Sequence, residues 1–451
     1  MNTLFQVAFD LVLPCLFLVV AVAWLGRGGM DIVAVALPYA LLFAFGMMAV
    51  NTLLGVYRRA PGRLMASTWA RVILCFVLAA PVAYGMSSLV PGPAGWHEKL
   101  EMAVLLALAV MVAVRGYVGR GARAPLLARR VMVLGTGAEA AAVERSLTQS
   151  GPGVRIVGFY PVRPDEAVHV ARDRVLSADG YSLADIARKH KVDEIVVAVH
   201  ERRDNAVPLR GLLDCKLAGV RVLDLSGYFE RALGQVRLES LRASWLIYGE
   251  GFRQGTVRRV AKRVFDVIAA MLLLGVFWPL MLLSAILIAL ESGFPVFYRQ
   301  ERVGQGGRLF RLVKLRSMRS DAEYDGTPRW AASHDERATR VGRALRRFRI
   351  DELPQLYNVL KGDMSLVGPR PERPYFVAQL TCEIPFYAAR HSVKPGLTGW
   401  AQVRYRYGAS VNDAAQKLQY DLYYAKNHTL FLDTVILFET VGVVLSGAGA
   451  H

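Results

Sequence analysis

The feature that most constrains this chain is a set of four long apolar stretches in its first part. They occupy residues 5–26, 32–54, 71–90 and 100–118. Each is close to the roughly 20 residues that an α-helix needs to cross a bilayer. Hydrophobic residues make up 54% of the 451-residue chain, which is more than a soluble domain needs. The pattern therefore predicts a bundle of four transmembrane helices over residues 1–118.

Basic residues between these stretches predict the orientation of the bundle. They are concentrated in the second connection and after the fourth stretch, as Arg58, Arg59, Arg63, Arg71, Arg120, Arg123, Arg129 and Arg130. Arginine and lysine accumulate on the cytoplasmic side of membrane helices, so both ends of the bundle are expected in the cytoplasm. The first stretch lacks a basic leader and a small-residue cleavage site, which favours an anchor over a signal peptide.

The charge balance indicates what kind of partner the chain binds. Its 55 lysines and arginines against 37 acidic residues give a net charge of +18. A basic and apolar chain suits anionic lipid head groups or phosphate-bearing substrates. No nucleic-acid-binding motif is present, so nucleic acid is not expected as a partner. The four cysteines are far apart in the sequence, which argues against zinc and against a disulfide framework.

Residues 119–250 have a different rhythm, in which short β-rich runs alternate with helical stretches. The expected strands are residues 131–134, 155–160, 194–199 and 221–225. Strands that alternate with helices are typical of a parallel sheet, and this segment is predicted to be a Rossmann-like α/β domain in the cytoplasm.

A glycine-rich turn follows the first of these strands. Gly135-Thr136-Gly137-Ala138-Glu139-Ala140 has the GxGxxA spacing, which allows phosphate to approach a helix N-terminus. The acidic residue that would bind a ribose is not at the end of the next strand, because Asp165 and Glu166 come later, in a loop. Two interpretations stay open: a nucleotide site, or a fold kept for regulation, folding or dimerisation.

A fifth apolar run, Val264–Leu290, opens the C-terminal unit. Basic residues flank both of its ends, whereas a spanning helix would place one cluster on the wrong side of the membrane. Pro279 in the middle removes a helical hydrogen bond. These features predict a mainly α unit over 251–451, with a re-entrant helix-break-helix near 264–290. The alternative is a fifth span kinked at Pro279. The last apolar stretch, 430–445, carries two acids and is expected to be an interfacial helix.

Adjacent carboxylates, Asp351-Glu352, follow an arginine-rich stretch. We expect these arginines to lower the pKa of Asp351 and keep it ionised. An ionised aspartate can attack phosphorus and form an acyl-phosphate. The neighbouring Glu352 is a candidate ligand for Mg²⁺, which neutralises pyrophosphate charge.

Several motifs of this unit are similar to those of the bacterial sugar transferases, the monotopic polyprenyl-phosphate hexose-1-phosphate transferases. The longest is Asp351-Glu352-Leu353-Pro354-Gln355, continuing to Gly368-Pro369-Arg370-Pro371-Glu372. Others are Lys262-Arg263-Val264-Phe265-Asp266, Arg302-Val303-Gly304, Lys314-Leu315-Arg316-Ser317-Met318 and Lys394-Pro395-Gly396-Leu397-Thr398-Gly399-Trp400. The resemblance covers about 190 residues, and the complete layout resembles the long subclass that starts exopolysaccharide synthesis.

The resemblance implies roles for particular residues. Asp351 matches the nucleophile, Glu352 the metal-associated carboxylate, and Pro279 the residue that breaks the re-entrant helix. The family often has serine before this proline, whereas Trp278 stands here. Candidate contacts to substrate and lipid phosphates are Lys314, Arg316, Arg340, Arg347, Arg370 and Arg373.

The implied activity is transfer of hexose-1-phosphate from a UDP-sugar to undecaprenyl phosphate through a phosphosugar on Asp351, with release of UMP. The expected place is the bacterial inner membrane, with the catalytic unit on the cytoplasmic face. Mg²⁺ is the expected cofactor, and the resemblance suggests a homodimer.

Two other functions are compatible with parts of the chain. A membrane-anchored nucleotide-sugar dehydratase or epimerase would share the first half but needs a second Rossmann unit, and the C-terminal unit lacks the alternation of strands and helices that such a unit would show. A scaffold for polysaccharide assembly would not need the dense C-terminal motifs. No motif encodes the identity of the transferred sugar.

Overall fold

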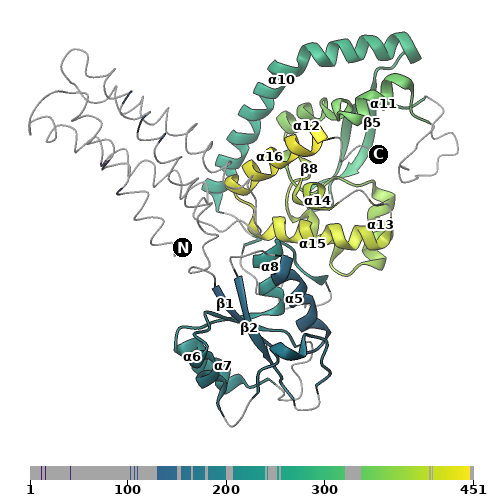
Figure 1. The fold of residues 1–451 in the computed structure, drawn as a ribbon. Coiled ribbons are helices and arrows are strands. Elements are labelled where there is room, and N and C mark those ends of the chain that lie inside the picture. The colour runs from purple at the N-terminus through teal and green to yellow at the C-terminus, as the bar shows by residue number, and fades with distance from the viewer. Residues whose placement is uncertain are drawn as a thin grey trace, which may run out of the picture. The chain divides into compact units, whose positions relative to one another are not determined.

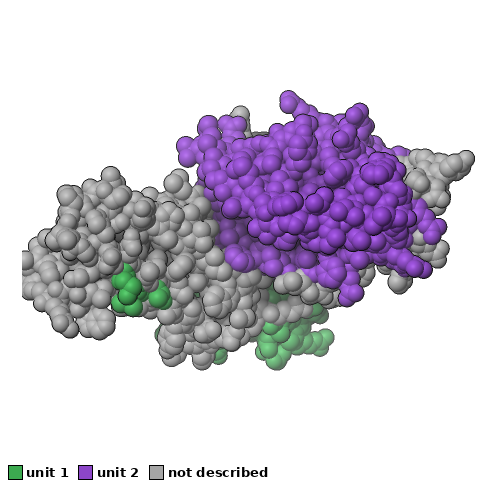
Figure 2. Space-filling model, turned by 90° about the horizontal axis from the view of Figure 1, so that it is seen from above, with its two compact units in different colours: residues 1–241 green, residues 242–451 purple. Residues whose placement is uncertain are grey.

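The structure is a computed structural model. It describes residues 129–149, 154–163, 166–177, 181–199, 207–238, 255–319, 337–405 and 410–446, together with a few isolated residues. Apart from such isolated residues, the four predicted transmembrane helices lie outside this part of the chain. Chain contacts divide the protein into two compact units, Met1–Leu241 and Arg242–His451, which are coloured separately in Figure 2.

The described part of the first unit contains a four-stranded sheet. Its strands are β1 (Arg129–Leu134), β2 (Val154–Tyr160), β3 (Glu194–Val197) and β4 (Arg221–Asp224). They pair in the order β2-β1-β3-β4, and all three pairings are parallel. The parallel α/β arrangement predicted from the sequence is thus present, with strands close to their expected positions.

Helices cover both faces of this sheet (Figure 1). α5 (Ala138–Gln149) and α8 (Leu225–Leu233) pack on one face, while α6 (Leu183–Lys189) and α7 (Leu209–Leu217) pack on the other. Side chains alternate along β1, so Val131 and Val133 join the first core, and Met132 and Leu134 join the second. A strand buried on both faces reads as a continuous apolar run, as β1 does.

The second unit is dominated by α10 (Thr256–Ser292), a helix of 37 residues. Within the described ranges it is the one helix long and apolar enough to cross a membrane, and only 11% of its most apolar window is buried. Helical structure continues through Pro279, because a proline removes a single backbone hydrogen bond. Figure 1 shows that α10 changes direction along its length. The predicted break is therefore a bend in a continuous helix.

Both ends of α10 pack against the body of the second unit. Near its start, the Arg263 guanidinium donates to the carbonyl oxygens of Val359 and Leu360, at 2.6 Å each. Near its end, the Glu291 carboxylate accepts hydrogen bonds from the backbone N–H groups of Arg340, at 2.8 Å, and Val341, at 3.0 Å. The apolar middle of the helix leaves the body and returns to it.

The rest of the unit surrounds two small sheets. β5 (Phe297–Val303) and β6 (Leu309–Leu315) form an antiparallel hairpin, and β7 (Ser365–Val367) pairs in parallel with β8 (Gly396–Thr398). The helices are α11 (Arg340–Arg347), α12 (Gln355–Lys361), α13 (Pro374–Glu383), α14 (Trp400–Arg404), α15 (Val411–Asn427) and α16 (Leu430–Ser446). The described unit is mainly helical, as predicted.

The helix predicted at an interface, α16, is largely enclosed by protein in its first half. Asp433 is fully buried there, and its Oδ2 lies 2.8 Å from Lys262 Nζ on α10. Lys262 also contacts Asp266 Oδ1, at 2.9 Å. The sequence pattern suggested an interfacial position because the acids interrupt an apolar run. The buried lysine on a distant helix accounts for one of them instead.

Candidate active site

The two predicted carboxylates lie in a short 3₁₀ turn between α11 and α12. Arg349 adopts a left-handed backbone conformation (φ 57°), which reverses the chain after α11 and starts the turn η5 (Ile350–Glu352). The tight turn buries both acids, which are only 6% (Asp351) and 7% (Glu352) exposed. Two adjacent buried carboxylates need nearby cations or hydrogen-bond donors, and Glu352 has more of them than Asp351.

Glu352 is surrounded by positive charge. Three cations contact its Oε1 atom: Lys314 Nζ at 3.2 Å, Arg349 Nη1 at 3.3 Å and Arg370 Nη2 at 3.3 Å. Burial by itself would raise the pKa of Glu352, but these charges outweigh it and hold the pKa well below its usual range. Glu352 is therefore ionised at neutral pH.

Asp351 has the opposite surroundings. Its Oδ1 atom is buried and accepts no hydrogen bond within the described part of the chain. Burial and the charge of Glu352 raise its pKa to about 6, against the weaker opposing effect of Lys314. Arg349 and Arg346 do lower the pKa of Asp351, but burial and Glu352 outweigh them, so the predicted net lowering is wrong. Asp351 Oδ1 is therefore a buried oxygen that no cation among the described residues contacts.

Arg370 reaches Glu352 from the segment that follows β7. The backbone there is closely packed: the Gly368 N–H donates to Thr398 O, and the Gly396 N–H donates to Pro369 O, both at 2.9 Å. A side chain at Gly368 would overlap the backbone of the neighbouring strand, which explains the glycine at this position. Backbone pairing thus holds the Gly-Pro-Arg-Pro segment in place.

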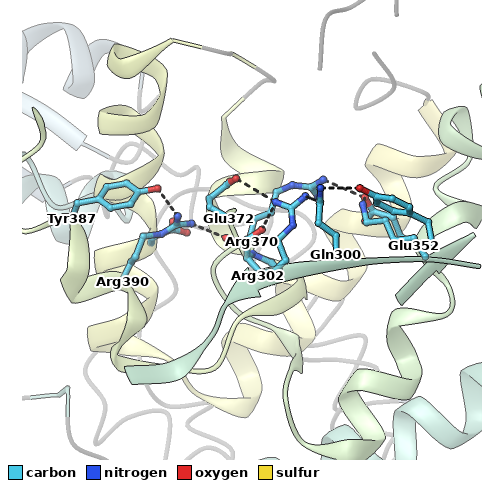
Figure 3. Close-up of polar contacts among 11 residues, drawn as sticks. Gln300, Arg302, Glu352, Arg370, Glu372, Tyr387 and Arg390 are labelled. Carbon is cyan, nitrogen blue, oxygen red and sulfur yellow. Dashed lines mark hydrogen bonds and ion pairs between the residues drawn. The ribbon is translucent and has the colours of Figure 1, made fainter. Parts of the chain in front are cut away.

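A row of polar contacts extends away from Glu352 (Figure 3). Arg302 on β5 donates to Gln300 Oε1 at 2.6 Å and lies 3.8 Å from Glu372 Oε2. Burial lowers the pKa of Arg302, and the charges of Arg370 and Arg373 lower it further. The site therefore contains more positive charge than its own acids balance, which favours an anionic substrate.

The structure brings some predicted phosphate contacts to the carboxylates and places others elsewhere. Lys314 and Arg370 contact Glu352 directly. Arg316 instead donates to the Ser292 carbonyl at 2.7 Å, at the end of α10. Arg347 is exposed and lies over the ring of Phe348, 5.7 Å from its centre.

Arg340 and Arg373 begin helices rather than face the carboxylates directly. Arg340 is the exposed first residue of α11, and its backbone N–H binds Glu291. Arg373 precedes α13 as its N-cap, close enough to Arg302 to affect its pKa.

The two carboxylates are also the expected place for the predicted Mg²⁺. Hard divalent cations prefer carboxylate oxygens, and Mg²⁺ usually takes one or two of them together with substrate phosphates. Asp351 Oδ1 is an unpaired buried acceptor beside Glu352, so the donor set fits. No group of three or more acids, histidines or cysteines suited to a metal occurs among the described residues. Any ion held here would need oxygens from the substrate.

Sequence reasoning missed three arginines that build the site. Arg349 was signalled by its position two residues before Asp351. Arg302 lies in the Arg302-Val303-Gly304 motif, for which no role was predicted. Arg390 carried no signal, since it lies outside every motif, yet it donates to Arg370 O at 3.0 Å.

The site combines a buried carboxylate pair with a cluster of cations, an arrangement that suits phosphate-bearing substrates. The family model described as "Bacterial sugar transferase" matches residues 257–447. The UDP-glucose:undecaprenyl-phosphate glucose-1-phosphate transferase of Xanthomonas campestris pv. campestris is 33% identical over 369 residues, or 79% of this chain and 75% of that protein.

Two further relatives extend the comparison. A UDP-N-acetylgalactosamine-undecaprenyl-phosphate N-acetylgalactosaminephosphotransferase of Aeromonas hydrophila is 45% identical over 242 residues, which is 54% of this chain and 56% of that protein. A UDP-glucose:undecaprenyl-phosphate glucose-1-phosphate transferase of Caulobacter vibrioides is 45% identical over 203 residues, which is 44% of this chain and 76% of that protein. The chain belongs to the bacterial sugar transferase family, and it is a transferase enzyme of that class.

Proposed function

We propose that this protein transfers hexose-1-phosphate from a UDP-sugar to undecaprenyl phosphate and releases UMP, through a covalent intermediate on Asp351. The observation that carries the proposal is the unpaired, buried Oδ1 atom of Asp351 within a cation-rich site. The names of the relatives support both substrates, because they include UDP-sugars and undecaprenyl phosphate.

The chemistry follows from the surroundings of the two acids. An ionised Asp351 oxygen attacks the sugar-bearing phosphorus of the donor, and the bond from that phosphorus to the bridging oxygen breaks, so UMP leaves. A phosphate oxygen of undecaprenyl phosphate then attacks the same phosphorus and frees the Asp351 carboxylate. A nucleophile desolvated by burial and kept free of a cation is more reactive than one held in an ion pair.

The cations around Glu352 have a second use in this scheme. Lys314 and Arg370 meet at Glu352 Oε1 and present positive charge where a pyrophosphate would lie. Charge fixed before the reaction stabilises the transition state without reorganisation. Mg²⁺ would fit the same place, with Glu352 as its protein ligand, and would neutralise the charge of the leaving UMP. Arg302 and Arg373 add to the local positive charge.

α10 is proposed as a re-entrant membrane helix. Its middle is exposed and apolar, with Leu272 65% and Val276 68% exposed, whereas both ends pack on one globular body. A helix whose ends meet the same body cannot place them on opposite sides of a bilayer. The basic residues that flank both ends of α10 favour the cytoplasmic face of the inner membrane for the site, where a soluble donor and a lipid acceptor can meet. Initiation of exopolysaccharide synthesis and a homodimer are part of the same proposal.

UMP release tests the proposal directly. Full-length protein in membranes is mixed with undecaprenyl phosphate, Mg²⁺ and a series of UDP-sugars, and UMP and lipid-linked sugar are measured together. We expect one UDP-sugar to give equal amounts of both products. With a donor labelled in its sugar-linked phosphate and no lipid acceptor, label is expected on the protein and not on Asp351→Asn. The proposal is wrong if no UDP-sugar yields UMP.

A further inference from the structure

The backbone segment that carries Arg370 is held at three consecutive carbonyl oxygens. Arg390 Nη2 donates to Arg370 O at 3.0 Å, and Arg302 Nη1 donates to Pro371 O at 3.1 Å. The next carbonyl, of Glu372, accepts from the Val303 N–H at 3.0 Å. Two side chains and one strand therefore fix a stretch that has no helix or sheet of its own.

Arg390 is itself held by buried partners. It is 5% exposed, its guanidinium lies 2.7 Å from Asp421 Oδ2 on α15, and it donates to the Tyr387 hydroxyl at 2.7 Å. Figure 3 shows the resulting row, which runs from Tyr387 through Arg390 and Arg370 to Glu352. A buried arginine whose charge is paired, and which donates one N–H to a carbonyl oxygen, is well suited to fix the position of that oxygen.

We propose that Arg390 and Arg302 are positioning residues that aim the Arg370 guanidinium at Glu352. Neither is placed against the carboxylates themselves, and each acts through the backbone of the 370–372 segment. The inference rests on the proposed function, because it gives Arg370 its task of holding Glu352 and the donor phosphate. Small displacements of such a group cost much activity, since catalysis depends on alignment within a fraction of an ångström.

A double-mutant cycle tests the inference. Arg390→Lys keeps the charge beside Asp421 but cannot reach all three partners, and we expect kcat/KM for UMP release to fall about 10- to 100-fold. In a variant that already carries Arg370→Ala, Arg390→Lys should lower kcat/KM little further, because the guanidinium that Arg390 positions is absent. Arg404→Lys is the matched control: this arginine pairs with Glu439 at 3.2 Å and lies over Trp400. It should leave kcat/KM within about threefold.

Hydrogen exchange provides a readout that does not require activity. Arg390→Lys should speed exchange of the amides of Gly368, Arg370 and Glu372, and Arg404→Lys should not. The inference would be overturned if the losses of kcat/KM in Arg390→Lys and Arg370→Ala multiplied fully in the double variant. Unchanged amide exchange in this segment would overturn it as well. Failure of the wild type to release UMP would instead count against the proposed function, and the exchange result would still judge the positioning role.

A second inference concerns the glycine-rich turn of the first unit. The turn follows β1, where the strand order changes direction between β1 and β3, the place where parallel α/β folds bind nucleotides. Its N–H groups are already in use. Glu166 Oε1 accepts from Thr136 N at 2.7 Å and Gly137 N at 3.2 Å, and Glu166 Oε2 accepts from Val162 N at 2.8 Å.

The loop around Glu166 lies against the turn as well. The His169 N–H donates to Thr136 O at 2.8 Å. Gly135 has φ 116°, and a side chain there would lie 2.8 Å from Ala198 O, so close backbone approach explains the glycine without a ligand. We infer that the Glu166 carboxylate is the permanent ligand of this turn. The Glu166 carboxylate occupies the position in which a dinucleotide phosphate would bind. The turn is therefore not available to nucleotides.

Hydrogen exchange on the full-length protein tests this assignment. Glu166→Ala should speed exchange at Thr136 and Gly137 about tenfold or more, because a charge-assisted hydrogen bond is lost. The control Glu144→Ala, which removes a surface ion pair to Arg174, should leave these amides unchanged. Millimolar NAD⁺ or UDP-glucose should not protect them in the wild type. Protection by either nucleotide would show that phosphate displaces Glu166, and unchanged exchange in Glu166→Ala would also overturn the assignment.

Discussion

Asp351 and Glu352 are adjacent in sequence but differ in electrostatic environment. Glu352 Oε1 receives three cations, while Asp351 Oδ1 receives no hydrogen bond from the described residues. Burial raises the pKa of both acids, but the cations outweigh it only at Glu352, so the pKa of Glu352 lies well below its usual range while that of Asp351 is raised. Pairs of acids separated in this way commonly divide the chemical roles between them.

Replacement of the proposed nucleophile should separate activity from stability. A buried aspartate with a raised pKa stabilises the fold as the neutral acid at low pH, and this contribution is lost as pH rises through about 6. At pH 7.5 the ionised Asp351 is a cost, which Asp351→Asn removes. We expect turnover to be abolished and the free energy of unfolding to rise by about 1–2 kcal/mol. Thermal unfolding measures the stability, and UMP release measures the turnover. A destabilised variant would contradict the prediction.

The pH dependence of the reaction should report the same acid. Protonated Asp351 is not a nucleophile, so kcat/KM is expected to fall about tenfold per pH unit below about 6. Arg349 lowers the pKa of both acids, and Arg349→Gln should move this acidic limb to higher pH. Rates are measured between pH 4.5 and 8, with the exposed Arg347→Gln as control. A limb that stays fixed in Arg349→Gln would exclude this origin.

At the scale of elements, α10 combines two features that conflict in a soluble protein. Its length and apolar surface suit a bilayer, while both ends are tied to the same body by polar contacts. Pro279 lies within this helix, and Figure 1 shows that α10 changes direction along its length. A bend of this kind lets one helix enter a membrane and still keep both ends on one face.

Labelling of both ends tests this topology. In a variant without native cysteines, single cysteines are placed by Arg258→Cys and Phe294→Cys, at exposed or half-buried positions beside the two ends. We expect a membrane-impermeant maleimide to label both in inverted inner-membrane vesicles and neither in intact spheroplasts. Opposite accessibility of the two cysteines would mean that α10 spans the membrane.

At the scale of the whole molecule, the matched family region and the second compact unit nearly coincide. The family model covers residues 257–447, and contacts separate residues 242–451 from the preceding chain. A sugar transferase of Bacillus subtilis is 41% identical to 42% of this chain, and the match covers 90% of that relative. A protein of about this unit's length therefore exists without the preceding segments.

A truncated chain should therefore keep the chemistry. Residues 251–451 alone, in detergent or nanodiscs, are expected to release UMP within about tenfold of the full-length rate, because every described contact of the carboxylates lies inside this segment. Asp351→Asn in the truncated chain is the negative control. If the truncated chain is folded but inactive, the first 250 residues contribute directly to the reaction.

Much of this protein was determined by its sequence alone. Periodicity in residues 119–250 predicted parallel strands, because strands buried on both faces are uninterrupted apolar runs. Motifs around Asp351 and Arg370 predicted the family, which the family model and the relatives confirm, while the roles of these residues stay predictions. The predicted membrane bundle before residue 118 stays a prediction. The apolar run Val264–Leu290 also predicted the position of the long helix, which extends from Thr256 to Ser292.

Tertiary structure decided what depends on contacts between distant residues. The sequence shows arginines near Asp351, but only the fold directs Arg370 and Lys314 to Glu352 and leaves Asp351 unpaired. Arg390 lies outside every motif, yet it holds the segment that carries Arg370. A pKa or a positioning role depends on distances of a few ångströms between residues far apart in the chain, and no local pattern encodes those distances.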